Sequence, residues 1–476
     1  MVLTDKFLLT DLYQISMIYG YWKNGIHQQR AIFNLYFRKP PFNGAYAVCA
    51  GLETALQFLK DYRPSESDLE FLSTLTGYDD KPLFSKEFLD FLRTFELELD
   101  IEAIPEGEIV FPNQPLMKIT GPLYQCQLVE TALLTIINFQ TLIATKASRI
   151  ITVTGGDPVL EFGLRRAQGL DGGISATRAA YIGGCHATSN VLAGKLFGIP
   201  VRGTHAHSWV MTFPDELSAF RAYAEALPNN CTFLVDTYST EQGILNAITV
   251  GKQLQQAGFP FYAIRLDSGD LLLLSKLARK LLDEAGFHQT QVVATNDLDE
   301  QSIATLKKNG APIGVWGVGT NLITANGQPA LGGVYKLAAI YQNEKWHYRV
   351  KLSEDVIKIS TPGNLSVFRV SNNNLNQFDF IQDTFTESNK QLVHPETGAF
   401  LETIPSNAQN LLVPVMQSGK RIYPELTLRE IRKNHFELRS KFDPALFKIE
   451  NPQKYPVLID ENLFKLKKEA INQKHS

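Results

Sequence analysis

Short apolar runs alternate with amphipathic helical patterns in the middle of the chain, and this alternation constrains the fold more than any other feature. The helical pattern is clearest at residues 274–285, where leucine and alanine recur along one helix face. Six apolar runs fit strands, at residues 158–163, 200–203, 232–236, 261–265, 291–295 and 313–318. The alternation predicts βα units and a parallel sheet, in either an α/β barrel or a doubly wound sheet.

Polar residues that can do chemistry follow the ends of these six runs. They are Arg165, Thr204, His207, Asp236, Thr237, Asp267, Asn296, Asp297, Gly319 and Thr320. In a barrel the carboxyl ends of all strands meet at one mouth, where barrel enzymes place their active sites. In an open sheet such residues would spread along an edge, with a crevice only at the switch point. The pattern therefore favours the barrel.

The segments on either side of this alternation have a different character. A chain of 476 residues exceeds the roughly 250–300 at which a single core stops growing. Residues 7–121 mix helical and strand patterns, residues 128–151 resemble a buried connecting helix, and the rhythm stops near residue 372. We therefore expect an N-terminal α/β (α+β) domain at residues 1–125, a barrel at 126–370, and a small C-terminal region at 371–476 that packs on the first two.

Charge and cysteine content exclude several classes of protein. A net charge of −3 argues against a nucleic-acid binder or a membrane-surface protein. The four cysteines are too far apart for a CxxC zinc site: Cys49, Cys126, Cys185 and Cys231. The longest apolar run, residues 132–145, is interrupted by polar residues and shorter than the ~20 residues of a membrane span. With no signal-peptide pattern at residues 1–6, we expect a cytoplasmic protein with reduced thiols.

A glycine-rich loop with two adjacent arginines, Arg165 and Arg166, follows the first apolar run at residues 162–173. Glycine lets backbone N–H groups approach a ligand, and a guanidinium binds two oxygens at once, so the loop suits phosphate or pyrophosphate. A plain turn with two surface arginines is the alternative. No GxxxxGK[ST] loop is present, and no GxGxxG follows a strand, so any nucleotide is held in another way.

Two histidines, His205 and His207, follow the second run in the segment Gly203-Thr-His-Ala-His-Ser. Their i, i+2 spacing can bind a metal such as zinc, although no third ligand lies at an obvious spacing. A histidine here can instead be a nucleophile or an acid–base group, because its pKa lies near neutrality. A hydrogen-bonded core histidine is the third reading.

Two carboxylates lie three residues apart after the fourth run, in Arg265-Leu-Asp-Ser-Gly-Asp. Asp267 can hold sugar hydroxyls or a magnesium ion, while Asp270 can cap the next helix, and a capping role for both is the alternative. The segment Gly317-Val-Gly-Thr follows the sixth run, where barrels often bind phosphate.

Five of these motifs, taken together, resemble the nicotinate phosphoribosyltransferase family in order and spacing. They are Leu9-Thr-Asp-Leu-Tyr, Glu161-Phe-Gly-Leu-Arg-Arg-Ala-Gln, Gly203-Thr-His-Ala-His-Ser, Arg265-Leu-Asp-Ser-Gly-Asp and Gly317-Val-Gly-Thr. The resemblance implies that nicotinate and phosphoribosyl pyrophosphate (PRPP) give nicotinate mononucleotide and pyrophosphate, coupled to ATP hydrolysis, in NAD synthesis. It also implies an irregular α/β barrel and a homodimer with shared active sites.

The resemblance further implies a role for each motif. His207 would be phosphorylated by ATP, which explains ATP use without a GxxxxGK[ST] loop, and Asp267 would hold the ribose or its Mg²⁺ and stabilise the transition state. Nicotinate would contact four residues: Tyr13, Phe162, Thr204 and Arg265, with Tyr13 supplied by the partner subunit. PRPP phosphates would contact Arg165, Gly319 and Thr320. We expect Mg²⁺ to arrive with PRPP and ATP rather than in a protein-only metal site.

Three alternatives remain at this point. The first is nicotinamide phosphoribosyltransferase, a sister family of the same architecture that carries an acidic residue near the ring substituent. The comparable stretch of this chain is the neutral Thr188-Ser-Asn, and a neutral pocket with Arg265 should favour an anionic pyridine over an amide. The second is a barrel enzyme that holds a metal on His205 and His207. The third is a non-catalytic protein on an enzyme scaffold, which the presence of His207, Arg165 and Asp267 together argues against.

Overall fold

The computed structural model of the chain describes residues 6–353, 355, 358–387 and 390–472. The part of the fold that positions the candidate site is a six-stranded parallel sheet in the order β7-β6-β11-β10-β9-β8. The strands are β6 (Val159–Glu161), β7 (Ala187–Thr188), β8 (Thr232–Leu234), β9 (Ala263–Leu266), β10 (Gln291–Ala294) and β11 (Val315–Val318). The predicted α/β class is confirmed. The sheet does not close into a full barrel: it is a half-barrel with β7 and β8 as its two edges, which makes the predicted barrel irregular.

One predicted strand is wrong. Residues 200–203 do not form a strand but a single bridge, in which Val201 pairs with Thr188. Pro200 has no N–H to donate to a ladder, so pairing stays local and the chain leaves the sheet at once. The edge of the sheet is formed instead by β7, which is only two residues long and carries no periodic signal.

Five helices of the described chain lie around this sheet: α7 (Leu170–Ile182), α10 (Glu216–Ala226), α11 (Thr240–Gln256), α12 (Leu271–Glu284) and α13 (Glu300–Lys308). Of these, α12 corresponds to the helical pattern at residues 274–285. Their starts follow capping chemistry, since the Asp270 side chain accepts from the Leu273 N–H and Asp299 forms a capping box with Ser302. Asp270 is therefore a helix cap, as one reading of its motif predicts.

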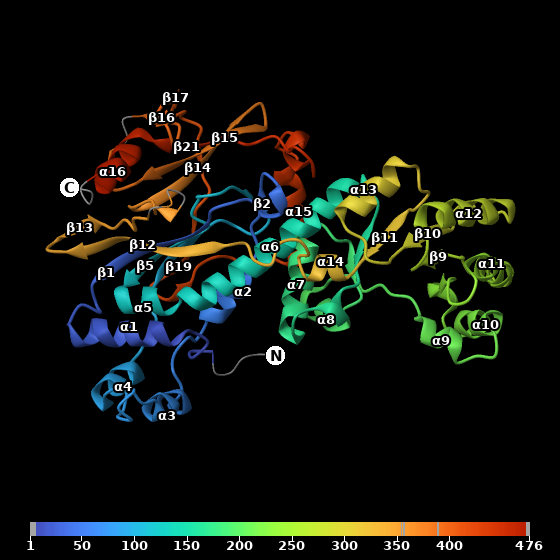
Figure 1. Cartoon of the computed structure of the whole chain (residues 1–476), viewed down its shortest axis with the longest axis horizontal. Coiled ribbons are helices and arrows are strands. Elements are labelled where there is room, and N and C mark those ends of the chain that lie inside the picture. The colour runs from blue at the N-terminus through green and yellow to red at the C-terminus, as the bar shows by residue number, and fades with distance from the viewer. Residues whose placement is uncertain (1–5, 354, 356–357, 388–389, 473–476) are drawn as a thin grey trace.

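A second, antiparallel sheet forms the other end of the elongated molecule (Figure 1). Its strand order is β13-β12-β1-β5-β3-β19-β20. The bounds are β1 (Arg30–Phe37), β3 (Asp100–Ala103), β5 (Met117–Pro122), β12 (Gly333–Gln342), β13 (Lys345–Tyr348), β19 (Val413–Gln417) and β20 (Lys420–Arg421). The interior strand β1 pairs with β12, which lies about three hundred residues further along the chain. Segments from all three predicted parts of the chain thus share one sheet.

Helices pack around this second sheet and connect it to the first. The short ones are α1 (Leu12–Lys23), α2 (Leu52–Leu59), α3 (Glu66–Thr74), α4 (Lys86–Arg93) and α5 (Leu123–Leu128). The long helix α6 (Glu130–Thr154) then packs against α7 and α13 of the half-barrel, and it corresponds to the connecting helix predicted at residues 128–151 (Figure 1). Across the described residues, no helix has both the length and the apolarity that a membrane crossing requires.

A third sheet, in the order β17-β16-β21-β15-β14-β18, is formed by the last part of the chain. Its elements are β14 (Leu365–Asn372), β15 (Leu375–Asp383), β16 (Gln391–Val393), β17 (Phe400–Thr403), β18 (Gln409–Asn410) and β21 (Val457–Asp460), with α15 (Leu428–Arg439) and α16 (Glu461–Asn472). Buried Arg369 joins this sheet to the N-terminal part through an ion pair with Glu108 (2.6 Å), and it also pairs with Asp379 on the neighbouring strand of its own sheet (2.8 Å). Arg432 on α15 donates to the Gly184 and Cys185 carbonyls of the half-barrel.

Candidate active site

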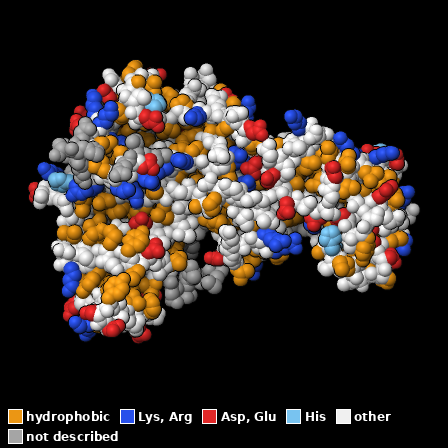
Figure 2. All heavy atoms as spheres, in the orientation of Figure 1, with side chains coloured by type: hydrophobic (Ala, Val, Ile, Leu, Met, Phe, Trp, Pro, Cys, Tyr) orange, Lys and Arg blue, Asp and Glu red, His pale blue; other side chains and the backbone are white. Residues whose placement is uncertain are grey.

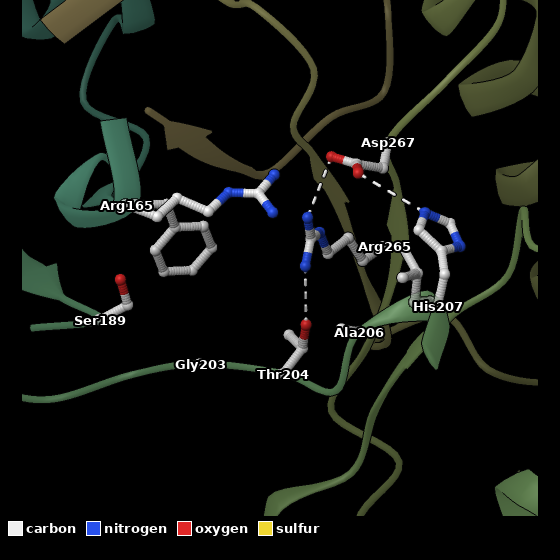
Figure 3. Close-up of a pocket in the computed structure, with 10 residues that line it drawn as sticks. Arg165, Ser189, Gly203, Thr204, Ala206, His207, Arg265 and Asp267 are labelled. Carbon is white, nitrogen blue, oxygen red and sulfur yellow. Dashed lines mark hydrogen bonds and ion pairs between the residues drawn. The ribbon is translucent and has the colours of Figure 1, made fainter. Parts of the chain in front are cut away.

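Two adjoining pockets lie at the carboxyl ends of the parallel strands. The first has a volume of about 230 Å³ and the second about 200 Å³. Four residues line both pockets: Phe162, Arg165, Arg265 and Asp267. The first pocket also contacts Ser189, Gly203, Thr204, Ala206, His207 and Leu234, and Figure 3 shows most of these side chains. Every predicted site residue except Tyr13 therefore lies in one of the two pockets.

Arg265 and Asp267 are held together by a closed set of hydrogen bonds. Arg265 Nη2 donates to Asp267 Oδ1 at 2.9 Å, and Arg265 Nε donates to Thr295 Oγ1 at 2.9 Å. Thr295 Oγ1 in turn donates to Asp267 Oδ1. Arg265 Nη1 donates to Thr204 Oγ1 at 3.0 Å, and Figure 3 shows this bond beside the one to Asp267. The guanidinium is thus fixed by all three of its nitrogens.

The same contacts keep Asp267 ionised. Burial by itself acts to raise the pKa of Asp267, but the Thr295 hydrogen bond and the charge and hydrogen bond of Arg265 hold this pKa below its ordinary value. His207 contributes in the same direction. At neutral pH the pocket therefore contains a carboxylate rather than a carboxylic acid.

His207 begins the short helix α9 (His207–Met211), and its ring is partly exposed to the pocket. Its Nδ1 lies 3.1 Å from Thr237 Oγ1, and its Nε2 lies 3.7 Å from Asp267 Oδ2. The ring is therefore oriented on one side by a hydroxyl at the end of β8 and on the other by a carboxylate. Such an arrangement presents Nε2 to the pocket.

His205 has a structural role instead. It is buried, its Nε2 accepts from the Leu234 N–H at 3.2 Å, and its ring packs against Tyr223. Burial lowers the pKa of His205 to about 4, so the ring is neutral at physiological pH. Both ring nitrogens face the protein, since Nδ1 lies 3.4 Å from the Ala206 carbonyl.

The metal-binding alternative gains no support from this geometry. Among the residues that the structure describes, no group of three His, Cys, Asp or Glu side chains could hold a metal ion. His205 uses its nitrogens in the core, which leaves His207 without a histidine partner. The third reading of this motif, a hydrogen-bonded core histidine, holds for His205.

Phe162 forms one wall of both pockets because β11 carries a glycine beside it. A Cβ at Gly317 would lie 2.8 Å from Phe162 Cδ2 and 2.5 Å from Thr295 Cγ2. The Arg265 guanidinium lies 6.0 Å from the centre of the Phe162 ring. An aromatic face next to a fixed guanidinium suits a flat, anionic ring.

Glu161 holds the ends of β6 and β7 together behind this wall. Its carboxylate accepts from the Gly163 N–H, from Thr177 Oγ1 at 3.0 Å and from Thr188 Oγ1 at 2.6 Å. Burial raises the pKa of Glu161, and the three hydrogen bonds act against that rise. Ser189, the next residue after β7, is thereby placed in the first pocket.

The second pocket has the composition of a phosphate site. It is lined by Arg165, Arg166, Asn296, Asp297, Gly317, Gly319 and Thr320, in addition to Arg265, Asp267, Thr295 and Phe162. In Figure 3 the guanidinium groups of Arg165 and Arg265 point toward one another. Two facing cations favour an anion between them.

Two residues of this second pocket have strained backbones. Asn296 and Asp297 have φ values of 86° and 45°, a region that non-glycine residues rarely adopt outside turns and functional sites. Asn321 supports this turn by donating to the Asp297 carbonyl at 2.7 Å. The sequence places both residues after the fifth strand but assigns them no role. An adjacent Asn and Asp is a signal for a turn with left-handed backbone, and it could have marked these two residues.

Tyr13 is the one predicted site residue that the chain does not bring to the pockets. It lies on α1, beside the antiparallel sheet, and 48% of its surface is exposed. Of the neutral segment Thr188-Ser-Asn, only Ser189 lines the first pocket, because Asn190 is buried and caps α8 (Val191–Phe197).

Comparisons with known proteins identify the family. The models for the nicotinate phosphoribosyltransferase (NAPRTase) N-terminal domain, the NAPRTase family and the C-terminal domain match residues 8–138, 159–372 and 368–467. A nicotinate phosphoribosyltransferase of Bacillus subtilis (strain 168) is 44% identical over 475 residues, which cover 98% of this chain and 95% of that protein. The chain belongs to the nicotinate phosphoribosyltransferase family.

Solved structures agree with this membership of the nicotinate phosphoribosyltransferase family. The crystal structure of human nicotinic acid phosphoribosyltransferase superposes with a TM-score of 0.84 at 32% identity and covers 97% of this chain and 100% of that one. A nicotinate-nucleotide pyrophosphorylase from Pyrococcus furiosus shares the fold, with a TM-score of 0.68 at 22% identity over 91% of this chain and 94% of that chain.

Proposed function

We propose that this protein transfers the phosphoribosyl group of PRPP to nicotinate, in a reaction coupled to ATP hydrolysis. The observation that carries the proposal is the position of Asp267. It lies between a pocket with an aromatic wall and a fixed guanidinium, and a pocket with three arginines and a glycine turn. The sugar between a pyridine and two phosphate groups would occupy that position.

The first pocket fits nicotinate better than nicotinamide. Arg265 offers a guanidinium that can bind the nicotinate carboxylate, Phe162 offers a ring face, and Thr204 lines the same pocket. Ser189 is neutral, so no carboxylate on that side competes for Arg265 or accepts from an amide N–H. An anionic ring therefore gains more here than a neutral one.

The second pocket fits the phosphates of PRPP. Arg165, which lines this pocket, would bind the pyrophosphate, and Gly319 and Thr320, at the start of α14 (Thr320–Ile323), would bind the 5-phosphate. In the reaction the pyridine nitrogen forms a bond to C1 of the ribose while the C1–oxygen bond to pyrophosphate breaks. The ribose gains positive charge as this happens, and the ionised Asp267 lies where it can stabilise that charge.

Magnesium fits this site as a partner of the substrate phosphates. Mg²⁺ binds one or two protein carboxylates together with phosphate oxygens, and it neutralises the charge of the leaving pyrophosphate. Asp267 and Asp297 are the carboxylates that line the second pocket and would hold it. A protein-only cage needs more ligands than these two.

ATP coupling is assigned to His207. With its hydrogen on Nδ1 and donated to Thr237, the ring presents the Nε2 lone pair to the pocket. Nε2 attacks the γ-phosphorus of ATP and ADP leaves, which gives a phosphohistidine whose hydrolysis releases phosphate. Thr237 fixes the ring for this attack, and no GxxxxGK[ST] loop is required.

We also propose a cytoplasmic homodimer with shared active sites. Leu12, Tyr13 and Met17 are exposed along α1, and Figure 2 shows hydrophobic side chains gathered over this part of the molecule. A second copy seated there would bring Tyr13 to the nicotinate pocket of its partner. All four cysteines are buried, unpaired thiols, which fits a reducing compartment.

A substrate comparison tests the proposed function. The purified protein is incubated with PRPP, Mg²⁺ and ATP, and either nicotinate or nicotinamide, and the mononucleotide product is measured. We expect turnover of nicotinate and at least ten-fold less of nicotinamide, since a charged hydrogen bond contributes about 1.5–3 kcal/mol. A preference for nicotinamide, or turnover of neither, would contradict the proposal.

A further inference from the structure

We propose that Thr295 is a positioning residue for the transfer reaction, because its single hydroxyl fixes both Arg265 and Asp267. This inference rests on the proposed function. Thr295 lies directly after β10, its side chain is buried, and it lines the second pocket. The sequence gives no hint of this role, since a threonine after Val-Val-Ala simply resembles the end of a strand.

The hydroxyl has one hydrogen to donate and lone pairs to accept with, and at this position it both donates and accepts. It accepts from Arg265 Nε at 2.9 Å and donates to Asp267 Oδ1, with the Leu266 carbonyl 3.1 Å away as a second acceptor. Arg265 Nη2 donates to the same Asp267 oxygen at 2.9 Å. Three residues thus form a closed ring of hydrogen bonds.

These three hydrogen bonds orient the Arg265 guanidinium and the Asp267 carboxylate. Because Oδ1 of Asp267 takes both donors of the ring, Oδ2 is the oxygen that faces His207. The Arg265 guanidinium is held from Nε by Thr295 and from Nη1 by Thr204 at 3.0 Å, so its plane is set beside the Phe162 face. Without the hydroxyl, Nε loses its acceptor, Asp267 Oδ1 loses one of its two donors, and the guanidinium is held only through Thr204 and Asp267.

The methyl group of Thr295 fixes the hydroxyl in turn. Thr295 Cγ2 would lie 2.5 Å from a Cβ at Gly317, so the methyl packs directly against the backbone of β11. A threonine has few rotamers, and this contact selects the one in which Oγ1 faces the pocket. Valine at position 295 keeps the shape and the methyl contact and removes only the hydroxyl.

The experiment compares T295V with T295S and with T290V as a matched control. Thr290 is a buried threonine at the other end of the same strand, and its Oγ1 donates to the Phe261 carbonyl at 2.9 Å. Its loss removes a similar hydrogen bond far from both pockets. Nicotinate KM and kcat, PRPP KM and the thermal unfolding midpoint are measured for each variant and for the unsubstituted protein.

We expect T295V to lose about ten- to a hundred-fold in kcat/KM for nicotinate, the range for one hydrogen bond to a charged group. T290V should stay within about three-fold of the unsubstituted protein, and T295S, which keeps the hydroxyl but not the methyl, should lose clearly less than T295V. A T290V loss equal to that of T295V would show a general effect on the strand, and a T295S loss equal to that of T295V would show that shape rather than the hydroxyl matters. Unchanged kinetics of T295V would also overturn the inference.

A crystal structure of T295V separates this inference from the proposed function. If the unsubstituted protein turns over nicotinate poorly, the proposed function fails, but the hydrogen bonds among Thr295, Arg265 and Asp267 can still be examined. The inference predicts a displaced Arg265 guanidinium and a rotated Asp267 carboxylate in T295V. Arg265 and Asp267 in unchanged positions would overturn it whatever the kinetics show.

Discussion

His207 Nε2 lies 3.7 Å from Asp267 Oδ2, although the two residues are sixty positions apart and belong to different βα units. Asp267 also lies between the aromatic pocket and the arginine-rich pocket. One carboxylate is therefore shared by the histidine proposed to accept phosphate from ATP and the site proposed to bind the ribose. Through this contact, a change in the charge of His207 alters the electrostatic environment of the carboxylate at the transfer site.

Replacement of His207 by alanine should uncouple transfer from ATP. The H207A variant retains Arg265, Phe162 and the phosphate pocket, so it should still make some nicotinate mononucleotide, but ATP should no longer stimulate the reaction. Initial rates with and without ATP, together with acid-labile ³²P incorporation from γ-labelled ATP, measure this. Stimulation or labelling equal to that of the unsubstituted protein would rule out the phosphohistidine role.

Replacement of Asp267 by asparagine should slow the transfer step by a factor of ~10² or more, because a charge that stabilises the transition state is removed. Asparagine keeps the size of the side chain and one acceptor for Thr295 or Arg265. The rate is measured at saturating nicotinate and PRPP. A variant that loses stability but keeps kcat would show that Asp267 is only a structural residue.

Replacement of Gly317 by alanine should damage nicotinate binding. The added methyl would lie 2.5 Å from Thr295 Cγ2 and 2.8 Å from Phe162 Cδ2, well inside van der Waals contact, so both the residue that holds Arg265 and the ring that walls the pocket must move. We expect KM for nicotinate to rise about ten-fold, for a cost of about 1.4 kcal/mol in the overpacking range. The ratio of nicotinate KM to PRPP KM reports this, and an unchanged ratio would contradict the proposed position of nicotinate.

Stability should fall as the pH drops from about 6.5 toward about 4, because His205 is neutral in the folded protein. The pKa of His205 is lowered by burial from 6.5 to about 4, so below 6.5 the unfolded chain takes up a proton that the folded chain does not. Each such histidine then costs about 1.4 kcal/mol of unfolding free energy per pH unit. Buried His435, with a pKa of about 4, acts in the same direction.

Urea unfolding between pH 7 and pH 4.5 measures this dependence. The variant H205Q has no titrating group at position 205 and should lose stability less steeply with falling pH than the unsubstituted protein. H205Q keeps an acceptor for the Leu234 N–H. Its stability at pH 7 therefore reports the effect of the substitution on packing, separately from the effect on titration. Parallel pH curves for the two proteins would contradict the buried, neutral state of His205.

The sequence predicts the alternation of parallel strands and helices, and with it most of the pocket, for a simple physical reason. Parallel strands bring their carboxyl ends to one edge, so Arg165 and Asp267 lie near one another. Thr204 and His207 reach the same edge after the single bridge at Val201 rather than after a strand. The apolar helix pattern at residues 274–285 and the capping role of Asp270 are equally local signals, and the structure confirms both.

The features that the sequence misses depend on distant parts of the chain. The strand β7 is two residues long and has no periodicity, so residues 200–203 appear to be the better strand. The pairing of β1 with β12 joins segments three hundred residues apart, which no local pattern records. The role proposed for Thr295 depends on Arg265 and Asp267 at the end of the neighbouring strand, and the role proposed for Tyr13 requires a second chain.

The central claim is that nicotinate is the acceptor and that ATP drives its phosphoribosylation through His207. The most direct test measures nicotinate mononucleotide and ADP together, from nicotinate, PRPP and Mg²⁺ with and without ATP. The account predicts that ATP raises the yield of mononucleotide and that ADP appears in step with it, and that ADP formation stops in H207A. Mononucleotide formation that ignores ATP, or ADP formation that continues in H207A, would contradict it.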